Sequence, residues 1–187
     1  MMSSIRETLG SIKADLQGIN AQRYQRQISP GLQEYVEAKL FQHYLETGEI
    51  LGLQSAAQTI PADIQLTHDD YVLGLFDTTG EMMRFAVTNL AMNASNLGAE
   101  GGEFNRTNIL TDMQQLRSCL ETIDASPSFG LARDFEQKLK VTRASVEKVE
   151  YAMYSMLVRG KERPKGWKPD ASLAEGTKEE YDIETFP

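Results

Sequence analysis

Cysteine, histidine and basic charge are scarce in this sequence, and each shortage excludes a class of function. Cys119 is the only cysteine among 187 residues, so neither an internal disulfide framework nor a multi-cysteine zinc site can form. Lys and Arg number 19 against 27 Asp and Glu, which gives a formal net charge of −8. Because phosphates are neutralised by clustered basic residues, this balance argues against nucleic-acid binding by the chain alone. A metal ion or a basic partner would have to supply the missing charge.

Long apolar runs are missing as well. No stretch approaches the roughly eighteen apolar residues that indicate a transmembrane helix, and the first residues lack the apolar core of a signal peptide. We therefore expect no membrane association and a cytoplasmic or nuclear protein. The single cysteine agrees with a reducing compartment of that kind.

Several catalytic motifs are excluded in the same way. No Glu has a His three residues later, which removes the ferritin-like di-iron site, and no G-x-x-x-x-G-K loop is present to cradle a phosphate. The histidines, His43 and His68, are interpreted as surface or capping residues. Cys119 lies in a predicted helix, where a cysteine is more often a small core residue than a nucleophile.

The sequence does contain strong helical periodicity. Apolar residues recur at steps of three and four through most of the chain, and no segment shows convincing period-two alternation. We therefore predict an all-α fold, a single antiparallel helical bundle formed by residues 1–160 and followed by an extended or disordered acidic tail at 161–187. The predicted helices cover residues 4–19, 30–47, 69–90, 107–125 and 135–159, with a short helical turn near 55–57.

Local signals predict where these helices begin and end. Ser29-Pro30 indicates a helix start, because Ser caps free N–H groups and Pro suits the first helical position. Gly48 indicates the end of the same helix. Thr67 or Asp69 is expected to cap the long helix that follows.

The predicted helix 69–90 is the element against which the others are expected to pack. It carries an apolar stripe on one face, formed by Val72, Leu75, Thr79, Met82, Ala86 and Leu90. Gly74 and Gly80 interrupt this helix, and each costs about 1 kcal/mol relative to Ala. We therefore expect another backbone to approach closely at both glycines.

Two pairs of acidic residues on two predicted helices form the candidate site. Glu34 and Glu37 are three residues apart, with Phe41 nearby to shield part of their face, and Asp77 and Glu81 are four apart. Like charges at such spacing cost about 0.2–0.5 kcal/mol, so the acids are either solvated or share a cation. Two helices that each offer two carboxylates can converge on one Mg²⁺ or Mn²⁺, which prefer oxygen ligands. A solvated acidic face is the alternative.

A basic stretch between residues 159 and 168 surrounds Trp167. Its residues can contact RNA through charge and stacking, or they can form a cationic tail at the end of a helix. The pattern alone leaves both interpretations open.

Three segments together carry a resemblance to a known family. They are GLQEYVEAKLFQHYLETG at 31–48, DYVLGLFDTTGEMMRFAVTNL at 70–90 and VEKVEYAMYSMLVRGKERPK at 146–165. The chain resembles the translin family over most of residues 4–165, and within that family the members called translin-associated factor X (Trax). GLQEYVEA combined with D-x-T-G-E-x-M-R is more specific than any acidic pair alone.

The resemblance implies a helical bundle of the translin type and an endoribonuclease site. Trax carries that site in its complex with translin, a closed hetero-octameric shell that cleaves single-stranded RNA and is expected also to bind single-stranded DNA. The implied biological work is removal of passenger strands in RNA silencing, or processing of transfer-RNA fragments. The implied catalytic and metal-binding acids are Glu34, Glu37, Asp77 and Glu81, with Mg²⁺ or Mn²⁺ as the cofactor.

The sequence also departs from the family pattern. The family's longer N-terminal region, with its first long helix and a basic targeting segment, has no counterpart here, so we expect an N-terminally short member. The glycine-rich loop 97–103 and the acidic tail are further peculiarities. The same resemblance allows a second function, a non-catalytic scaffold subunit that completes the translin shell and keeps its acids as a solvated face.

Overall fold

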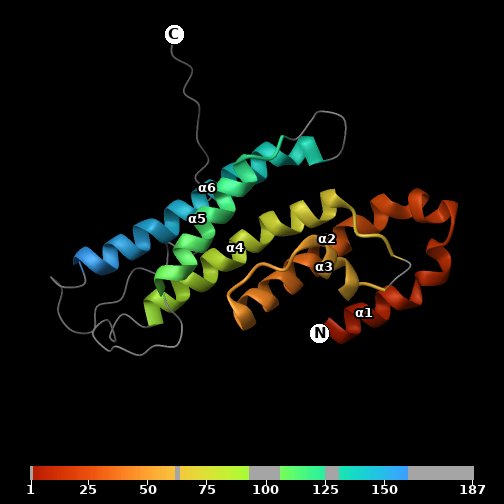
Figure 1. Ribbon diagram of the computed structural model, residues 1–187, viewed down its shortest axis with the longest axis horizontal. Coiled ribbons are helices and arrows are strands. Elements are labelled where there is room, and N and C mark those ends of the chain that lie inside the picture. The colour runs from red at the N-terminus through yellow and green to blue at the C-terminus, as the bar shows by residue number, and fades with distance from the viewer. Residues whose placement is uncertain (1, 62–63, 93–105, 125–130, 160–187) are drawn as a thin grey trace, which may run out of the picture.

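The computed structural model describes residues 2–61, 64–92, 106–124 and 131–159. Its elements are α1 (Met2–Ser11), the 3₁₀ turn η1 (Lys13–Leu16), α2 (Ile19–Thr47), α3 (Leu53–Thr59), α4 (His68–Met92), α5 (Arg106–Glu121) and α6 (Leu131–Tyr154), which continues as a π-helical turn, η3 (Ser155–Arg159). Every regular element in these ranges is helical (Figure 1), which confirms the all-α prediction. The predicted tail, the loop 97–103 and the basic stretch after residue 159 lie outside the described residues, so the domain boundary at 160 stays a prediction.

The helix α4 lies between α2 on one side and α5 and α6 on the other (Figure 1). Its contacts with α2 advance along both helices together, since Asp70 bonds to Ser29 and Phe85 packs edge-on against Phe41. The two helices therefore run in the same direction. The chain returns between them through α3, and Tyr71 on α4 donates a hydrogen bond to the Leu51 carbonyl of this connection.

The predicted antiparallel packing holds for α5, whereas α2, α4 and α6 run the same way. Phe76 packs on Phe135 and Thr79 bonds to Thr142, so α4 and α6 advance together. Opposite polarity is seen between α5 and α6, where the hydrogen-bonded pairs are Gln114–Glu150 and Glu121–Arg143. An intervening helix or a long connector separates each parallel pair in the sequence, which is what permits this arrangement.

The Ser29-Pro30 signal was misleading, because Pro30 lies inside α2 rather than at its start. An internal proline removes a backbone hydrogen bond and costs about 3 kcal/mol. Side chains on both sides of it offset that cost: Gln25 and Ser29 before the proline and Gln33 after it all donate to the Asp70 carboxylate on α4. These bonds hold both halves of α2 against the same partner helix.

Other predicted boundaries were met to different degrees. Gly48 ends α2 with a φ of 77°, and Thr67 accepts a hydrogen bond from the Asp70 N–H at the start of α4, both as predicted. The first predicted helix, 4–19, is wrong in its second half, since α1 stops at Ser11 and Gly18 turns the chain with a φ of 61°. The helix α5 ends at Glu121, earlier than the predicted residue 125.

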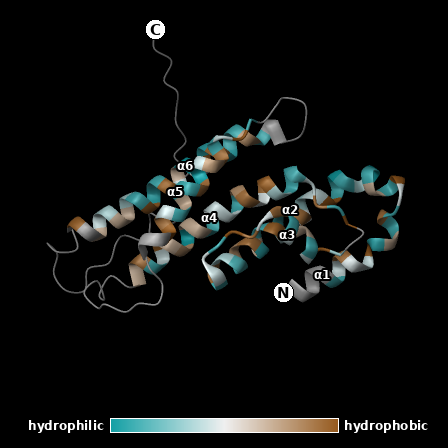
Figure 2. Ribbon diagram, in the orientation of Figure 1, coloured by the Kyte–Doolittle hydropathy of each residue, from teal (hydrophilic) through white to brown (hydrophobic). Residues whose placement is uncertain are grey.

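The core follows α4, as the predicted stripe required. Leu75, Thr79, Met82, Ala86 and Leu90 are buried, and Val72 is partly buried. One buried cluster joins α2, α4, α5 and α6 around Met82 and Val146, a second includes Val36 and Phe76, and a third joins α1, η1 and α2 around Leu16 and Leu32. Hydrophobic and hydrophilic segments alternate along each helix in Figure 2, the pattern of amphipathic helices packed in a bundle.

Two predictions about single residues in the helices were wrong. A Cβ at Gly80 would meet nothing within 4 Å, so no backbone approaches there. Cys119 is exposed on α5 instead of filling the core, because the buried side of that helix is taken by Met113 and Leu120. Among the described helices, none combines the length and the apolar character needed to cross a bilayer.

Candidate active site

The predicted acids come from α2 and α4 where these helices approach most closely. The approach is made possible by Gly74, where an added Cβ would lie 2.8 Å from Val36 Cγ1 and 3.0 Å from the Gln33 carbonyl oxygen. Glu37 follows Val36 directly on α2, and Asp77 lies one turn beyond Gly74 on α4. The glycine therefore brings the two acidic pairs of the sequence analysis to a common interface.

The electrostatics of Glu37 show that the four acids influence one another. Burial raises the pKa of the Glu37 carboxyl, and the negative charges of Asp77, Glu34 and Glu81 raise it further, while Arg84 acts in the opposite direction. Glu34 is exposed and the other acids are half-buried. A carboxylate that is partly removed from water and surrounded by like charges is poised to accept a proton or a cation.

Two cations already lie among these acids. Lys138 on α6 donates to Asp77 Oδ1 at 2.5 Å, and Arg84 on α4 donates to Glu81 Oε1 at 2.7 Å. The Lys138 and Asp77 side chains are 27% and 39% exposed, whereas Arg84 is 69% exposed. The site therefore combines acidic residues from two helices with a partly buried lysine from a third.

The donor set suits a hard divalent cation in its chemistry, since it offers four carboxylates against two positive side chains. In the described parts of the chain, however, no three Asp, Glu, His or Cys side chains are arranged so that they could hold one ion. Mutual repulsion at Glu37 and the pairing of Asp77 with Lys138 account for the difference between these two observations. The ligand set stays a prediction.

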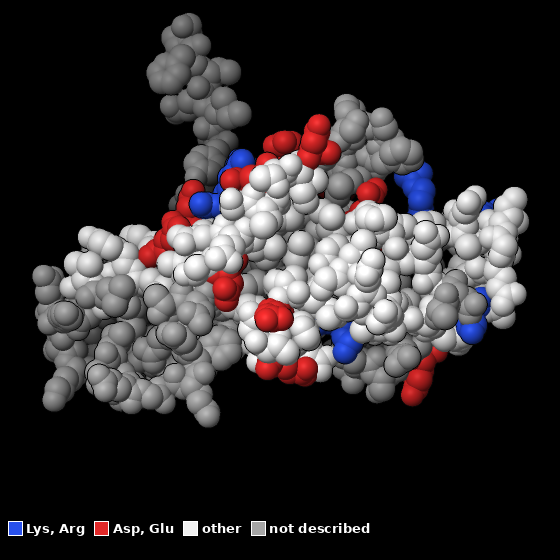
Figure 3. Space-filling model, viewed as in Figure 1, with Lys and Arg blue, Asp and Glu red and all other residues white. Residues whose placement is uncertain are grey.

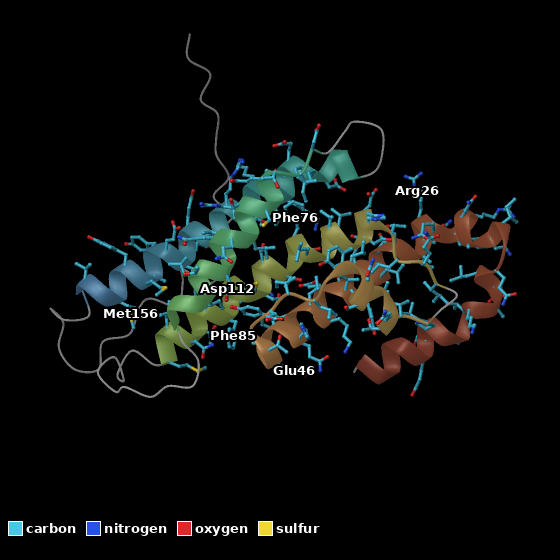
Figure 4. All side chains as sticks on the ribbon, viewed as in Figure 1. Arg26, Glu46, Phe76, Phe85, Asp112 and Met156 are labelled. Atoms are coloured by element: carbon cyan, nitrogen blue, oxygen red, sulfur yellow. The ribbon has the colours of Figure 1, made fainter. Side chains whose placement is uncertain are left out.

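The surroundings of the acids are ordered on both sides. Asp70 is 2% exposed and accepts hydrogen bonds from Gln25, Ser29, Gln33 and Thr67, which fixes the start of α4 against α2. Beyond the acids, the rings of Phe41 and Phe85 meet at 6.0 Å in an edge-on contact, consistent with the shielding expected of Phe41. Figure 4 shows Phe85 on α4, and Phe76 further along the same helix.

Sequence comparison agrees with this architecture. The model of the translin family matches residues 1–160. The chain belongs to the translin family. It is similar to the translin-associated protein X homolog of Schizosaccharomyces pombe, with 36% identity over 159 residues, which cover 83% of this chain and 62% of that protein.

Mammalian members of the translin family show the same relationship. Identity to the translin-associated protein X of Mus musculus is 27% over 190 residues, covering 88% of this chain and 61% of the relative. Identity to the Rattus norvegicus protein is 26% over the same length. The chain thus spans about three fifths of the length of these relatives, and the resemblance to Trax members is confirmed.

Sequence reasoning about this translin-family chain missed its two cations. Arg84 stands three residues after Glu81, a spacing at which opposite charges pair on a helix, so a signal for it was present. Lys138 had a weaker signal, since it directly precedes Leu139 of the apolar seam and therefore lies at the edge of the face that α6 turns toward α4. Only the packing of α6 on α4 reveals which acid it meets.

Proposed function

We propose that this chain is the catalytic subunit of a metal-dependent endoribonuclease that cleaves single-stranded RNA by phosphodiester hydrolysis in a complex with translin. The observation that carries the proposal is the mutual influence of four carboxylates from α2 and α4, at the positions implied by the Trax resemblance. Family membership and similarity to translin-associated proteins support it.

Each acid has a proposed role. Glu34, Glu37 and Asp77 act as metal ligands, and Glu81 acts either as a ligand or as the base that accepts a proton from the attacking water at its carboxylate. A bound Mg²⁺ or Mn²⁺ would neutralise charge developing on the phosphate oxygens and activate water for in-line attack. The raised pKa of Glu37 makes its carboxylate more basic than a fully solvated glutamate. Phe41 and Phe85 limit the access of water from one side.

The proposed partner is translin, in the hetero-octameric shell implied by the resemblance. The relatives' printed names describe them as translin-associated, and a net charge of −8 favours a basic partner for capture of RNA. On the face shown in Figure 3, basic side chains lie apart with acidic and uncharged surface between them. Tyr151, Tyr154 and Val158 leave apolar area exposed at the end of α6, as a partner surface requires.

The test is cleavage of a labelled single-stranded RNA by the chain reconstituted with translin, first with Mg²⁺ and then with a chelator. We expect cleavage to require the metal and to vanish in a Glu34→Ala, Glu37→Ala double variant. The control is Glu46→Ala, Glu49→Ala, which removes two exposed acids at the end of α2. Cleavage by the site variant at the wild-type rate would reject the assignment.

One observation favours the second candidate, the non-catalytic scaffold. Asp77 and Glu81 are already paired with Lys138 and Arg84, and no three-ligand group exists in the described residues. A metal that binds the native state stabilises it by about 2.7 kcal/mol at a hundred times Kd. Thermal unfolding with and without Mn²⁺ separates the candidates, because a scaffold would show the same melting temperature in both.

A further inference from the structure

The acidic site contains a cation that the chain itself supplies from a third helix. Lys138 on α6 lies next to the buried Leu139, and its Nζ reaches Asp77 Oδ1 at 2.5 Å across 61 residues of sequence. The lysine side chain is 27% exposed and the carboxylate 39%, so the pair is partly shielded from water. Such a pair is held more firmly than a fully exposed one.

Asp77 faces two neighbours at once. It binds Lys138 through one oxygen, and its charge is the largest of the neighbouring charges that raise the pKa of Glu37. The carboxylate thus lies between α2 and α6, in contact with the lysine and within electrostatic reach of Glu37. A cation placed among the acids would draw on the same carboxylate as the ammonium.

Arg84 cannot play an equivalent part. It pairs with Glu81 three residues earlier on its own helix, and its side chain is 69% exposed. An exposed pair within one helix contributes little and can open freely into solvent. Of the two cations at the site, Lys138 is therefore the one whose displacement has an appreciable effect.

We propose that Lys138 competes with the divalent ion for Asp77 and thereby sets the affinity of the site for that ion. This inference rests on the proposed function, since it takes the acids to be a metal site. Displacement from Asp77 leaves the ammonium without its partner beside the incoming RNA, where a phosphate oxygen replaces the carboxylate as its acceptor. Binding of the ion and binding of the phosphodiester are then mutually strengthened.

The test measures binding of Mn²⁺ to the full chain, from the electron paramagnetic resonance signal of the free ion. The variants are Lys138→Met and, as a control, Lys140→Met, an exposed lysine on the same helix. Both remove one positive charge, so their difference isolates the contact with Asp77. We expect Mn²⁺ to bind Lys138→Met about three- to tenfold more tightly than Lys140→Met. Lys138→Arg, which keeps the charge, should resemble the wild type.

The outcomes distinguish this inference from the proposed function. Equal Mn²⁺ affinity in the two methionine variants, together with loss of binding in Glu34→Ala, Glu37→Ala, overturns the competition and leaves the metal site standing. Binding by none of the proteins overturns both. Circular dichroism verifies the fold, and Lys138→Gln replaces the methionine variant if that one does not fold.

The phosphate contact has its own readout in the same assay. A single-stranded deoxyoligonucleotide should tighten Mn²⁺ binding to the wild type more than to Lys138→Met. An equal gain in both proteins would overturn the role of Lys138 in phosphate binding.

Discussion

At the scale of single residues, Gly74 determines how closely α2 and α4 approach. Replacing Gly74 with Ala would place a methyl group 2.8 Å from Val36 Cγ1 and 3.0 Å from a backbone oxygen, which cannot move aside easily. We expect Gly74→Ala to lower the free energy of unfolding by about 1–3 kcal/mol, as overpacking does. Gly80→Ala is the matched control, because its Cβ meets nothing within 4 Å and a helical Ala gains up to about 1 kcal/mol. Urea unfolding of both variants measures the difference, and equal shifts would contradict it.

Asp70 is the second residue on which the interface depends. Its carboxylate is 2% exposed and accepts hydrogen bonds from four side chains, so Asp70→Ala leaves buried donors unsatisfied. We expect a loss of about 3 kcal/mol in the free energy of unfolding. Asp69→Ala removes a neighbouring acid from the first turn and should cost no more than about 1 kcal/mol. Similar losses in the two variants would contradict the role of the network.

The protonation of Glu37 gives the site a pH signature. Its folded-state pKa lies above the model value of 4.5, so the native chain binds the proton more tightly than the unfolded chain does. The stability contributed by the protonated form is complete below 4.5 and is lost as pH rises through the raised folded value. Glu37→Gln should therefore melt at a higher temperature than the wild type at neutral pH, with the difference disappearing in acid. A variant that is less stable at neutral pH would contradict this sign.

At the scale of elements, prediction was successful where one helix satisfied its own pattern. The stripe on α4, the stop at Gly48 and the short helix α3 followed from spacing and local residue preferences. Prediction was wrong where another helix overrode the local signal, as at Pro30, whose neighbours Gln25, Ser29 and Gln33 are tied to Asp70. The acidic pairs were visible in the sequence, but Lys138 was missed because the acid it meets is fixed by the packing of α6.

Proline at position 30 offers a test of that override. Replacing it with Ala restores an N–H to the interior of α2 and removes the ring from the helix. Part of the gain is lost, because an unfolded chain without this proline has more conformational freedom. We expect Pro30→Ala to raise the free energy of unfolding by about 1–2 kcal/mol, measured by urea unfolding. A decrease would mean that the proline stabilises the helix where it stands.

At the scale of the whole molecule, charge governs how the chain meets its proposed substrate. With a net charge of −8, the chain repels a polyanion, and neutralisation of phosphates must come from elsewhere. We expect the chain alone to bind a single-stranded oligoribonucleotide at least about tenfold more weakly than its complex with translin at the same salt concentration. Fluorescence anisotropy measures both affinities. Equal affinities would remove the argument for a basic partner.

The parallel course of α2, α4 and α6 also bears on how the protein folds. The contacts that unite these helices join residues 45, 61 and 63 positions apart in the chain, in the pairs Gln25–Asp70, Asp77–Lys138 and Thr79–Thr142. A bundle of successive antiparallel neighbours has mostly local contacts, whereas this one has a high contact order for a helical protein and should cross its folding barrier more slowly. The acids and the lysine that accompanies them come together only when the distant segments have met. The chemistry of the site is thereby reserved for the completely folded chain.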